Sequence, residues 1–331
     1  MASIWSQLTQ ASTEKQAHDC VLYPIEDQQA LAISGPDSSK FMQGQFTCHL
    51  NEITPQSFRN GACCNAKGRM VASFQLMQQT ENAYLLTMHE SLSETLQSHL
   101  KKYMVFFKTQ MQPANYVGAG ITGADAKNLL ESVFPNVPEQ PFAQVVHEGH
   151  ILIQLPHGAG YQLWLAQEQA LDILNKLNSK CTLSNNNQWN ENLIRHGLGF
   201  VSAKISEELI PQMMNLSQCG GVSFSKGCYT GQEIVARMQY LGKLKRHMYR
   251  IALDSQHKVS AGDDVFAKEH ASPVGVVVNA TLIDNQQQAL IVLEDKALTA
   301  LAEGAIFVGP EQVIAKELLS LPYDVIDGQP D

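Results

Sequence analysis

The chain has 331 residues, which is more than one ordinary hydrophobic core holds and suits two or three packed units. Hydrophobic residues make up 44% of the chain and charged residues 17%, a composition that excludes a disordered protein. The formal net charge of -9 argues against a protein whose main task is to grip a nucleic-acid backbone, so we expect no direct, stable binding to nucleic acid.

The first residues and the cysteines indicate the cellular compartment. Residues 1–7 have no basic start followed by an apolar run, and no stretch reaches the roughly 20 apolar residues that span a bilayer. The seven cysteines are odd in number, scattered, and contain no CxxC pair. We therefore expect a cytoplasmic protein with reduced thiols, no membrane partner, and no zinc or iron–sulfur cage.

Two similar segments indicate a repeated unit. Residues 33–42 (ISGPDSSKFM) align with residues 121–130 (ITGADAKNLL). Each segment predicts a short strand, a glycine turn, and a helix with an acidic residue in its first turn. Two such units favour an α+β body built from repeated halves, which we place at residues 1–115 and 116–244.

Further elements follow in chain order. Residues 84–88 are typical of a strand, and leucines recur at helical spacing through residues 92–103. Beyond a proline-rich loop, residues 151–155 and 161–165 predict two paired strands, followed by another amphipathic helix. From about residue 246, short β-type runs separated by glycine, proline and asparagine predict a small β-barrel over residues 245–331.

A glycine-rich run at residues 118–123 matches the dinucleotide-binding pattern GxGxxG. The acidic residue that should hold a ribose about 20 residues later is missing, because a proline-rich loop occupies that region. We therefore interpret Gly123 as a turn glycine and expect no nicotinamide or flavin. A P-loop is excluded as well, since no Gly-Lys-Ser or Gly-Lys-Thr occurs in a suitable position.

The strongest chemical signal is the run Lys226-Gly227-Cys228-Tyr229-Thr230-Gly231-Gln232-Glu233. Its glycines predict an exposed loop, and a helix is expected from Gln232 onward. Cys228 would then lie just ahead of a helix N-terminus and two residues from Lys226, and both features favour a thiolate. A buried Cys228 that acts as a small hydrophobic residue is the alternative, and the spacing does not decide between them.

The same run leaves the partners of the thiol open. No histidine lies near Cys228 in the sequence to act as the base of a hydrolase. Gln232 and Glu233 are candidates to orient a ligand through hydrogen bonds.

Two more features each allow two interpretations. The densest basic stretch consists of Arg237, Lys243, Lys245, Arg246 and Arg250. It is either a solvated face or an anion site, and runs of charge are usually solvated. Trp189 lies among polar residues. An indole exposed at one edge can stack on a flat heterocycle, whereas a buried indole would anchor the following helix.

Several segments together resemble the YgfZ family. They are residues 41–45 (FMQGQ), 66–70 (AKGRM), 210–216 (IPQMMNL), 220–224 (GGVSF) and 226–233 (KGCYTGQE). The last run is the most specific of them. The resemblance extends from about residue 30 to Glu233, while the barrel-like tail agrees only in its architecture.

The resemblance implies relatives of the glycine-cleavage aminomethyltransferases, with a folate-binding α+β body, a C-terminal barrel, and tetrahydrofolate as the ligand. It implies Gln28 and Trp189 as pterin contacts, although the contact at the position of Gln28 is aromatic in one bacterial member. Relatives often carry aspartate at the position of Asn65, where the amide keeps a hydrogen bond. The acidic groups that handle the amine in aminomethyl transfer cannot be mapped onto this sequence.

The resemblance also implies that Cys228 is the catalytic thiol of the chain. The accompanying motif residues are Lys226, Gly227, Tyr229, Gly231, Gln232, Glu233 and Arg237. The implied partners are iron–sulfur client proteins, including tRNA-modifying enzymes. We therefore expect a folate-binding accessory protein that maintains iron–sulfur enzymes and thereby supports tRNA modification. A folate-dependent one-carbon (aminomethyl) transferase and a redox or scaffold protein without a small ligand are the alternatives.

Overall fold

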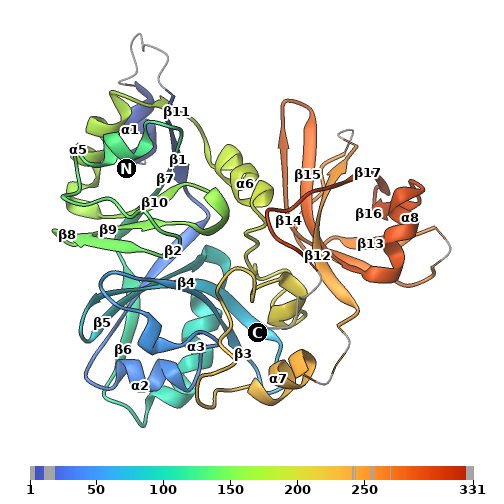
Figure 1. The fold of residues 1–331 in the computed structure, drawn as a ribbon, viewed down its shortest axis with the longest axis horizontal. Coiled ribbons are helices and arrows are strands. Elements are labelled where there is room, and N and C mark those ends of the chain that lie inside the picture. The colour runs from blue at the N-terminus through green and yellow to red at the C-terminus, as the bar shows by residue number, and fades with distance from the viewer. Residues whose placement is uncertain are drawn as a thin grey trace.

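The computed structural model describes residues 4–10, 19–240, 242, 244–254, 257–268 and 270–325. These residues form two open sheets, each with its own helices, and one closed barrel (Figure 1). The two sheets lie one above the other, and the barrel lies to one side of both. The α+β body with a C-terminal barrel that the sequence predicts is therefore confirmed.

The two similar segments of the sequence fold in the same way. β2 (Gln28–Ser34) turns into α2 (Ser38–Gln43), and β7 (Tyr116–Thr122) turns into α4 (Ala126–Leu130). Gly35 and Gly123 make the turns with φ of 132° and 114°. A Cβ on either glycine would lie within 2.3 Å of a backbone carbonyl oxygen, so no other residue fits.

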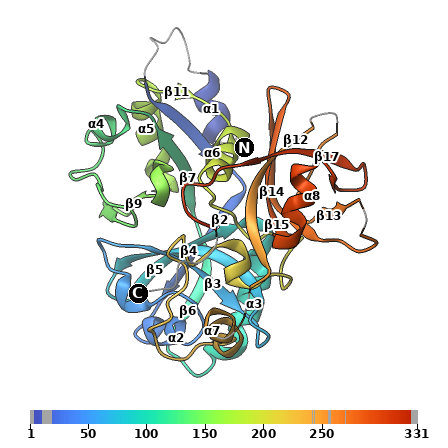
Figure 2. The ribbon, with the colours of Figure 1, turned by 45° about the vertical axis from the view of Figure 1, so that its right-hand side comes forward.

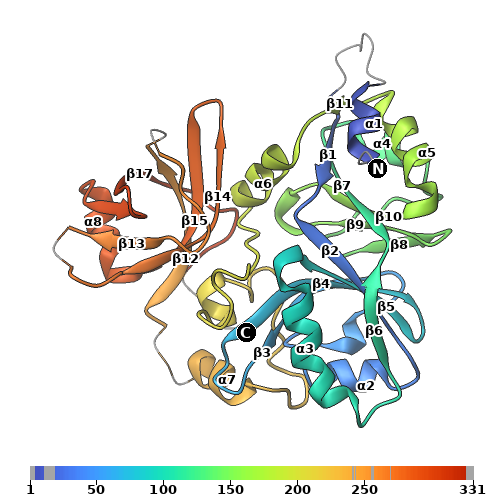
Figure 3. The same cartoon turned by 180° about the vertical axis from the view of Figure 1, so that it is seen from behind.

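The first half is built on an antiparallel sheet of five strands. In sheet order they are β3 (Arg59–Cys64), β4 (Met70–Thr80), β5 (Ala83–His89), β2 and β6 (Gln110–Ala114). The helix α3 (Ser93–Met104) packs against β4 and β6, as Figure 3 shows from behind. Two short 3-10 turns, η1 (Leu50–Glu52) and η2 (Glu90–Leu92), complete this half.

The second half is built on a sheet of six strands. In sheet order they are β11 (Thr182–Leu183), β1 (Val21–Ile25), β7, β10 (Tyr161–Ala166), β9 (His150–Gln154) and β8 (Gln144–His147). Its helices are α1 (Ile4–Gln10), α4 and α5 (Gln167–Asn178), and η3 (Pro156–Gly158) is the turn between β9 and β10. The strand β1 precedes the first sheet in the sequence but pairs with β7, so the early residues of the chain contribute to the second sheet.

The barrel closes through six strands with alternating apolar side chains inside. In order around the barrel they are β12 (Arg246–Leu253), β15 (Gln286–Glu294), β14 (Gly275–Ile283), β13 (Asp264–Ala267), β16 (Ile306–Val308) and β17 (Val313–Leu319). The short helices η5 (Asp295–Ala297) and α8 (Leu298–Ala302) lie between β15 and β16.

Three helical segments connect the body to the barrel. α6 (Asn186–Arg195) lies between the second sheet and the barrel, where it contacts β1 and β14 (Figure 2). The turn η4 (Pro211–Met214) and α7 (Gln232–Tyr240) follow, close to the first sheet. A shared core joins the two halves around Phe58, Leu85 and Trp164. None of the helices in these described ranges is long and apolar enough to span a bilayer.

Candidate functional site

Cys228 lies on a loop in which two exposed residues stand between two buried ones. Lys226 and Tyr229 are buried, whereas Gly227 and Cys228 are exposed to solvent. The other six cysteines of the chain are all buried. The alternative in which Cys228 is a buried hydrophobic residue is therefore wrong, and its thiol is available to a ligand or another protein.

Lys226 holds this loop from inside the protein. Its Nζ donates hydrogen bonds to the backbone oxygens of Gln43 at 2.8 Å, Phe46 at 2.5 Å and Cys48 at 3.0 Å. The same nitrogen lies 4.9 Å from the centre of the Tyr229 ring. Burial lowers the pKa of Lys226 to about 8, although the neighbouring Cys48 opposes this shift. The hydrogen bonds to the three oxygens favour the charged form. The ammonium group is thus directed into the protein, where it fixes the shape of the loop.

The segments that resemble the YgfZ family converge on the thiol loop, residues 225–231. The Thr230 amide donates to the Gly44 oxygen at 3.2 Å, which ties the loop to residues 41–45. Gly231 packs against the turn between β3 and β4 so closely that a Cβ would lie 2.5 Å from the Asn65 oxygen. The side chain of Gln212 donates to the Val235 oxygen of α7 at 2.6 Å. Residues far apart in the sequence therefore build one structure around Cys228.

The remaining residues of the motif have separate positions. The Gln232 side-chain oxygen accepts a hydrogen bond from the Tyr229 amide at 3.2 Å, so this amide closes the loop ahead of α7. Glu233 and Arg237 are exposed on α7. α7 begins four residues after Cys228, as the sequence indicates, so the thiol lies about one helical turn ahead of the helix.

Asn65 closes the neighbouring turn between β3 and β4. Its Oδ1 accepts hydrogen bonds from the amides of Lys67 at 2.9 Å and Arg69 at 3.2 Å. The Asn65 side chain is therefore engaged in hydrogen bonds within this turn. The turn itself packs on the thiol loop. An aspartate at this position would have the same acceptor.

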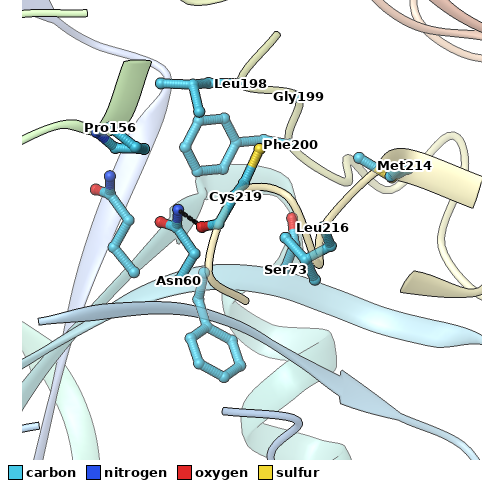
Figure 4. Close-up of a pocket in the computed structure, with 11 residues that line it drawn as sticks. Asn60, Ser73, Pro156, Leu198, Gly199, Phe200, Met214, Leu216 and Cys219 are labelled. Carbon is cyan, nitrogen blue, oxygen red and sulfur yellow. Dashed lines mark hydrogen bonds between the residues drawn. The ribbon is translucent and has the colours of Figure 1, made fainter. Parts of the chain in front are cut away.

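A central pocket lies between the two halves and the connection to the barrel (Figure 4). Its polar lining consists of Asn60, Ser73 and Gln75 from the first sheet, and all three are buried. The Asn60 amide donates to the Cys219 oxygen at 2.7 Å, and Figure 4 shows this bond below Pro156 and Leu198. Burial raises the pKa of the Cys219 thiol to about 12, so this second cysteine stays protonated.

The lining of the central pocket fits a pterin in its chemistry. Neutral amide and hydroxyl groups can pair with the donors and acceptors at the edge of such a ring, and Phe200 adds an aromatic face. The volume of the pocket is about 20 Å³, room for one or two water molecules. The pocket must therefore widen before it can hold a ring system.

Trp189 is fully buried, so of the two interpretations the core anchor is correct and the exposed indole edge is wrong. Its ring covers Gly120, where a Cβ would lie 2.3 Å from the indole, and its centroid is 5.5 Å from that of Tyr23. The polar neighbours of Trp189 on α6 have partners in the protein, since Asn190 donates to Asp27 at 2.7 Å and Asn192 donates to the Ala159 oxygen at 2.9 Å. The indole Nε1 is buried and has no hydrogen-bond partner among the described residues.

Gln28 and Trp189 lie close to each other in the structure. The Gln28 side-chain oxygen accepts a hydrogen bond from Gln162 at 3.4 Å, and Gln162 is the cross-strand partner of Gly120. The indole of Trp189 covers this same glycine. The structure thus brings together the two residues for which the resemblance implies a pterin contact.

The glycine-rich run at residues 118–123 has a packing explanation. A Cβ on Gly118 would lie 3.0 Å from Trp164, and one on Gly120 would overlap Trp189. Both glycines lie within β7, and Gly123 makes the turn that follows. The resemblance to a dinucleotide-binding motif therefore arises from two tryptophans that pack on one strand.

The basic stretch does not form one site. Arg246 pairs with Glu294 at 2.8 Å, and Arg250 donates to the Gln288 side chain at 2.7 Å, both within the barrel. Arg237 is exposed on α7, and Lys243 lies outside the described residues. In the described ranges, no group of three or more histidine, cysteine, aspartate or glutamate residues could hold a metal ion.

Residues 2–150 match the family described as the GCVT N-terminal domain. Three relatives have the name tRNA-modifying protein YgfZ. The protein from Pectobacterium carotovorum is 33% identical over 92% of this chain and 92% of its own length, and that from Pectobacterium atrosepticum is 33% identical over 97% and 96%. The protein from Escherichia coli O7:K1 is 34% identical over 80% of this chain and 82% of its own length. The chain belongs to the YgfZ family.

A solved structure supports the fold. Glycine cleavage system aminomethyltransferase T from Bartonella henselae superimposes with a TM-score of 0.71 over 96% of this chain and 89% of that protein. The two sequences are 16% identical, so this likeness concerns the fold alone. The family resemblance and the aminomethyltransferase-like architecture expected from the sequence are confirmed.

Proposed function

We propose that this chain is a folate-binding accessory protein that supports tRNA modification, with Cys228 as its functional thiol. The observation that carries the proposal is the convergence of the family's sequence segments on one exposed cysteine. A buried ammonium group and a glycine-to-backbone contact hold the loop in place. A loop that is fixed in this way around a solvent-exposed thiol favours a chemical role for the thiol over a packing role.

The folate part of the proposal rests on the GCVT N-terminal domain and on the central pocket. Tetrahydrofolate, when bound, would supply a carrier for one-carbon units. Asn60, Ser73 and Gln75 would meet the polar edge of its ring. Gln28 and the Nε1 of Trp189 are the contacts that the family resemblance implies; they lie beside the Gly120 strand and outside the lining of the central pocket.

The partners in this proposal are iron–sulfur client proteins, among them tRNA-modifying enzymes. Three relatives are named for tRNA modification, and a chain with a net charge of -9 is poorly suited to hold tRNA by itself. Support through client enzymes in the cytoplasm is consistent with both facts. The exposed Cys228 would be the group that meets the client or its cluster.

The thiol role is tested by Cys228→Ser in cells that lack the native protein. We expect the level of modified tRNA nucleosides, measured by mass spectrometry, to fall to that of the empty control. Because Cys228 is exposed, the melting temperature of the purified variant should stay unchanged. Ser225→Ala, a change on the same loop, is the matched control and should retain activity. Full activity of Cys228→Ser would exclude the thiol role.

The ligand is tested by calorimetric titration with tetrahydrofolate. We expect saturable binding to the wild type and a several-fold weaker affinity of Gln28→Ala, because one hydrogen bond is worth about 1 kcal/mol. Gln112→Ala, the same change at an exposed position of β6, is the control and should bind as the wild type does. Absence of binding heat and of any thermal shift with the wild type would favour a scaffold without a small ligand.

A further inference from the structure

Two buried cysteines from opposite ends of the second half lie next to each other. The Sγ atoms of Cys181 and Cys20 are 2.9 Å apart, although 161 positions separate them in the sequence. Both thiols are buried in the apolar core of the second half, with exposed fractions of 0% and 1%. No other pair of cysteine sulfurs has such a contact in the described part of the chain.

The strands that follow these cysteines set their geometry. β1 and β11 form a parallel ladder in which Val21 pairs with Thr182, and the Thr182 amide donates to the Cys20 oxygen at 2.9 Å. Cys20 and Cys181 are the next pair of this ladder. Neighbouring strands lie about 4.8 Å apart, which is within the Cα separation of about 4.4–6.8 Å that disulfides require.

The two thiols differ chemically from the other buried cysteines. The hydrogen bond from Cys181 lowers the pKa of the Cys20 thiol, although burial, Asp125 and Asp19 oppose this shift. Burial instead raises the pKa of Cys48, Cys64 and Cys219 to about 12. Of these four thiols, Cys20 is the one whose pKa is lowered, and its contact with the Cys181 sulfur is the cause.

We propose that Cys20 and Cys181 form a reversible disulfide that fastens β11 to β1 when the thiol pool becomes oxidising. With oxidised glutathione as the oxidant, the Cys20 thiolate attacks one glutathione sulfur and releases a glutathione thiolate, which takes up the proton that Cys20 lost. The Cys181 thiol then loses its proton and attacks the Cys20 sulfur of the mixed disulfide, which releases the second glutathione as a thiolate that takes up this proton. Two protein thiols are oxidised and one glutathione disulfide is reduced to two thiols.

Access to the pair comes from the edge of the sheet. β11 has two residues and is an edge strand, so its opening breaks only the short ladder to β1. Short edge strands with few hydrogen bonds open locally at low free energy. Oxidation is therefore expected in the folded protein, at a rate that is slow compared with that of the exposed Cys228.

The disulfide would act on the segment that carries Trp189. After β11 the chain reaches Asn185, whose side chain caps α6 by accepting from the Gln188 amide at 3.0 Å. α6 places Trp189 on Gly120 and contacts the barrel, where Thr281 donates to the Asn187 oxygen at 3.2 Å. A covalent link at β11 fixes the start of this connection. It also removes conformational freedom from the unfolded chain, because the loop that it closes is long.

The test uses the full chain with Cys228→Ser, which removes the exposed thiol as a competitor. The protein is incubated with oxidised and reduced glutathione mixtures and quenched with N-ethylmaleimide, and its peptides are mapped by mass spectrometry. We expect a Cys20–Cys181 peptide, loss of two alkylatable thiols, and a melting temperature several degrees higher than that of the reduced protein. Reduction with dithiothreitol should reverse both changes.

Cys20→Ser and Cys181→Ser, each in the same background, complete the design. Either variant should lose the glutathione-dependent rise in melting temperature, and Cys181→Ser should retain glutathione on Cys20. Cys48→Ser is the matched control, since Cys48 is buried without a sulfur partner nearby, and it should still form the disulfide. The proposal is overturned if both thiols remain alkylatable under the most oxidising mixture, or if the linked peptide forms only in unfolded protein.

Discussion

Lys226 shows how a charged residue can be structural. An ammonium group in the interior is costly unless hydrogen bonds replace its water, and the oxygens of Gln43, Phe46 and Cys48 do so here. The oxygens belong to the last residue of α2 and to the loop that joins α2 to β3. The lysine therefore links this loop to the thiol loop, and each depends on the other for its shape.

We predict that Lys226→Met lowers the free energy of unfolding by about 3 kcal/mol, because three buried carbonyls lose their donor. Urea denaturation of wild type and variant measures this difference. Lys67→Met, an exposed change on the adjacent turn, is the control and should stay within about 0.5 kcal/mol of the wild type. Equal stability of Lys226→Met and the wild type would show that the hydrogen bonds to Lys226 do not hold the loop.

At the scale of elements, the thiol loop is positioned by a glycine-to-glycine contact. Gly231 has φ of 85° and lies on the β3–β4 turn, where Gly68 has φ of 70° and contacts Ile234 of α7. Any side chain at these positions would push α7 away from the first sheet. Gly227, on the same loop, has open space around its Cβ position.

Gly231→Ala and Gly227→Ala therefore form a matched pair of tests. A Cβ at position 231 would lie 2.5 Å from the Asn65 oxygen and require a left-handed backbone, so we expect a loss of about 1–3 kcal/mol. Gly227→Ala should change stability by less than about 0.5 kcal/mol. Thermal denaturation compares the two, and the alkylation rate of Cys228 reports whether the loop has moved. Similar melting temperatures for both variants would refute this contact.

Local patterns in the sequence predict the elements but not all of their partners. The repeated strand–turn–helix units and the barrel follow from turn glycines and from strand-like runs, which depend on neighbouring residues. The place of β1 does not follow, because Val21 pairs with Thr122 and Thr182 across long separations. The choice between an exposed and a buried Trp189 stays open in the sequence for a similar reason. Its polar neighbours are visible in the sequence, whereas the glycine surface beneath it is 69 positions away, at Gly120.

At the scale of the whole molecule, the loop around Cys228 was predictable, whereas the exposure of its thiol and the pocket were not. A run such as KGCYTGQE is contiguous, so its glycines indicate an exposed loop directly, but they leave open whether the Cys228 side chain faces solvent. The central pocket instead gathers Asn60, Pro156, Phe200 and Cys219 from four separate segments. No short-range pattern connects such residues, because only the packing of the two halves brings them together.

The buried cysteines also give the whole molecule a dependence on alkaline pH. Cys48, Cys64 and Cys219 ionise near pH 12 in the folded protein, against an ordinary pKa of 9.0, because burial disfavours the thiolate. Between these values the unfolded chain has lost protons that the folded chain retains. The free energy of unfolding therefore falls as the pH rises above 9. Lys226 has the opposite effect, because its pKa is lowered to about 8 in the folded protein. The folded chain therefore releases this proton at a lower pH than the unfolded chain does, and the free energy of unfolding rises with pH on this account.

A comparison of the wild type with a triple variant separates the effect of the cysteines from that of Lys226, because both proteins contain Lys226. The triple variant Cys48→Ala, Cys64→Ala and Cys219→Ala lacks the three buried thiols. From pH 7.5 to pH 10, each thiol should cost the wild type about 1.4 kcal/mol, or about 4 kcal/mol in all. Urea denaturation under reducing conditions at the two pH values should show the wild type losing that much more than the variant. Parallel pH curves would mean that these thiols ionise equally in the folded and unfolded chains, and that the core around them is open to water.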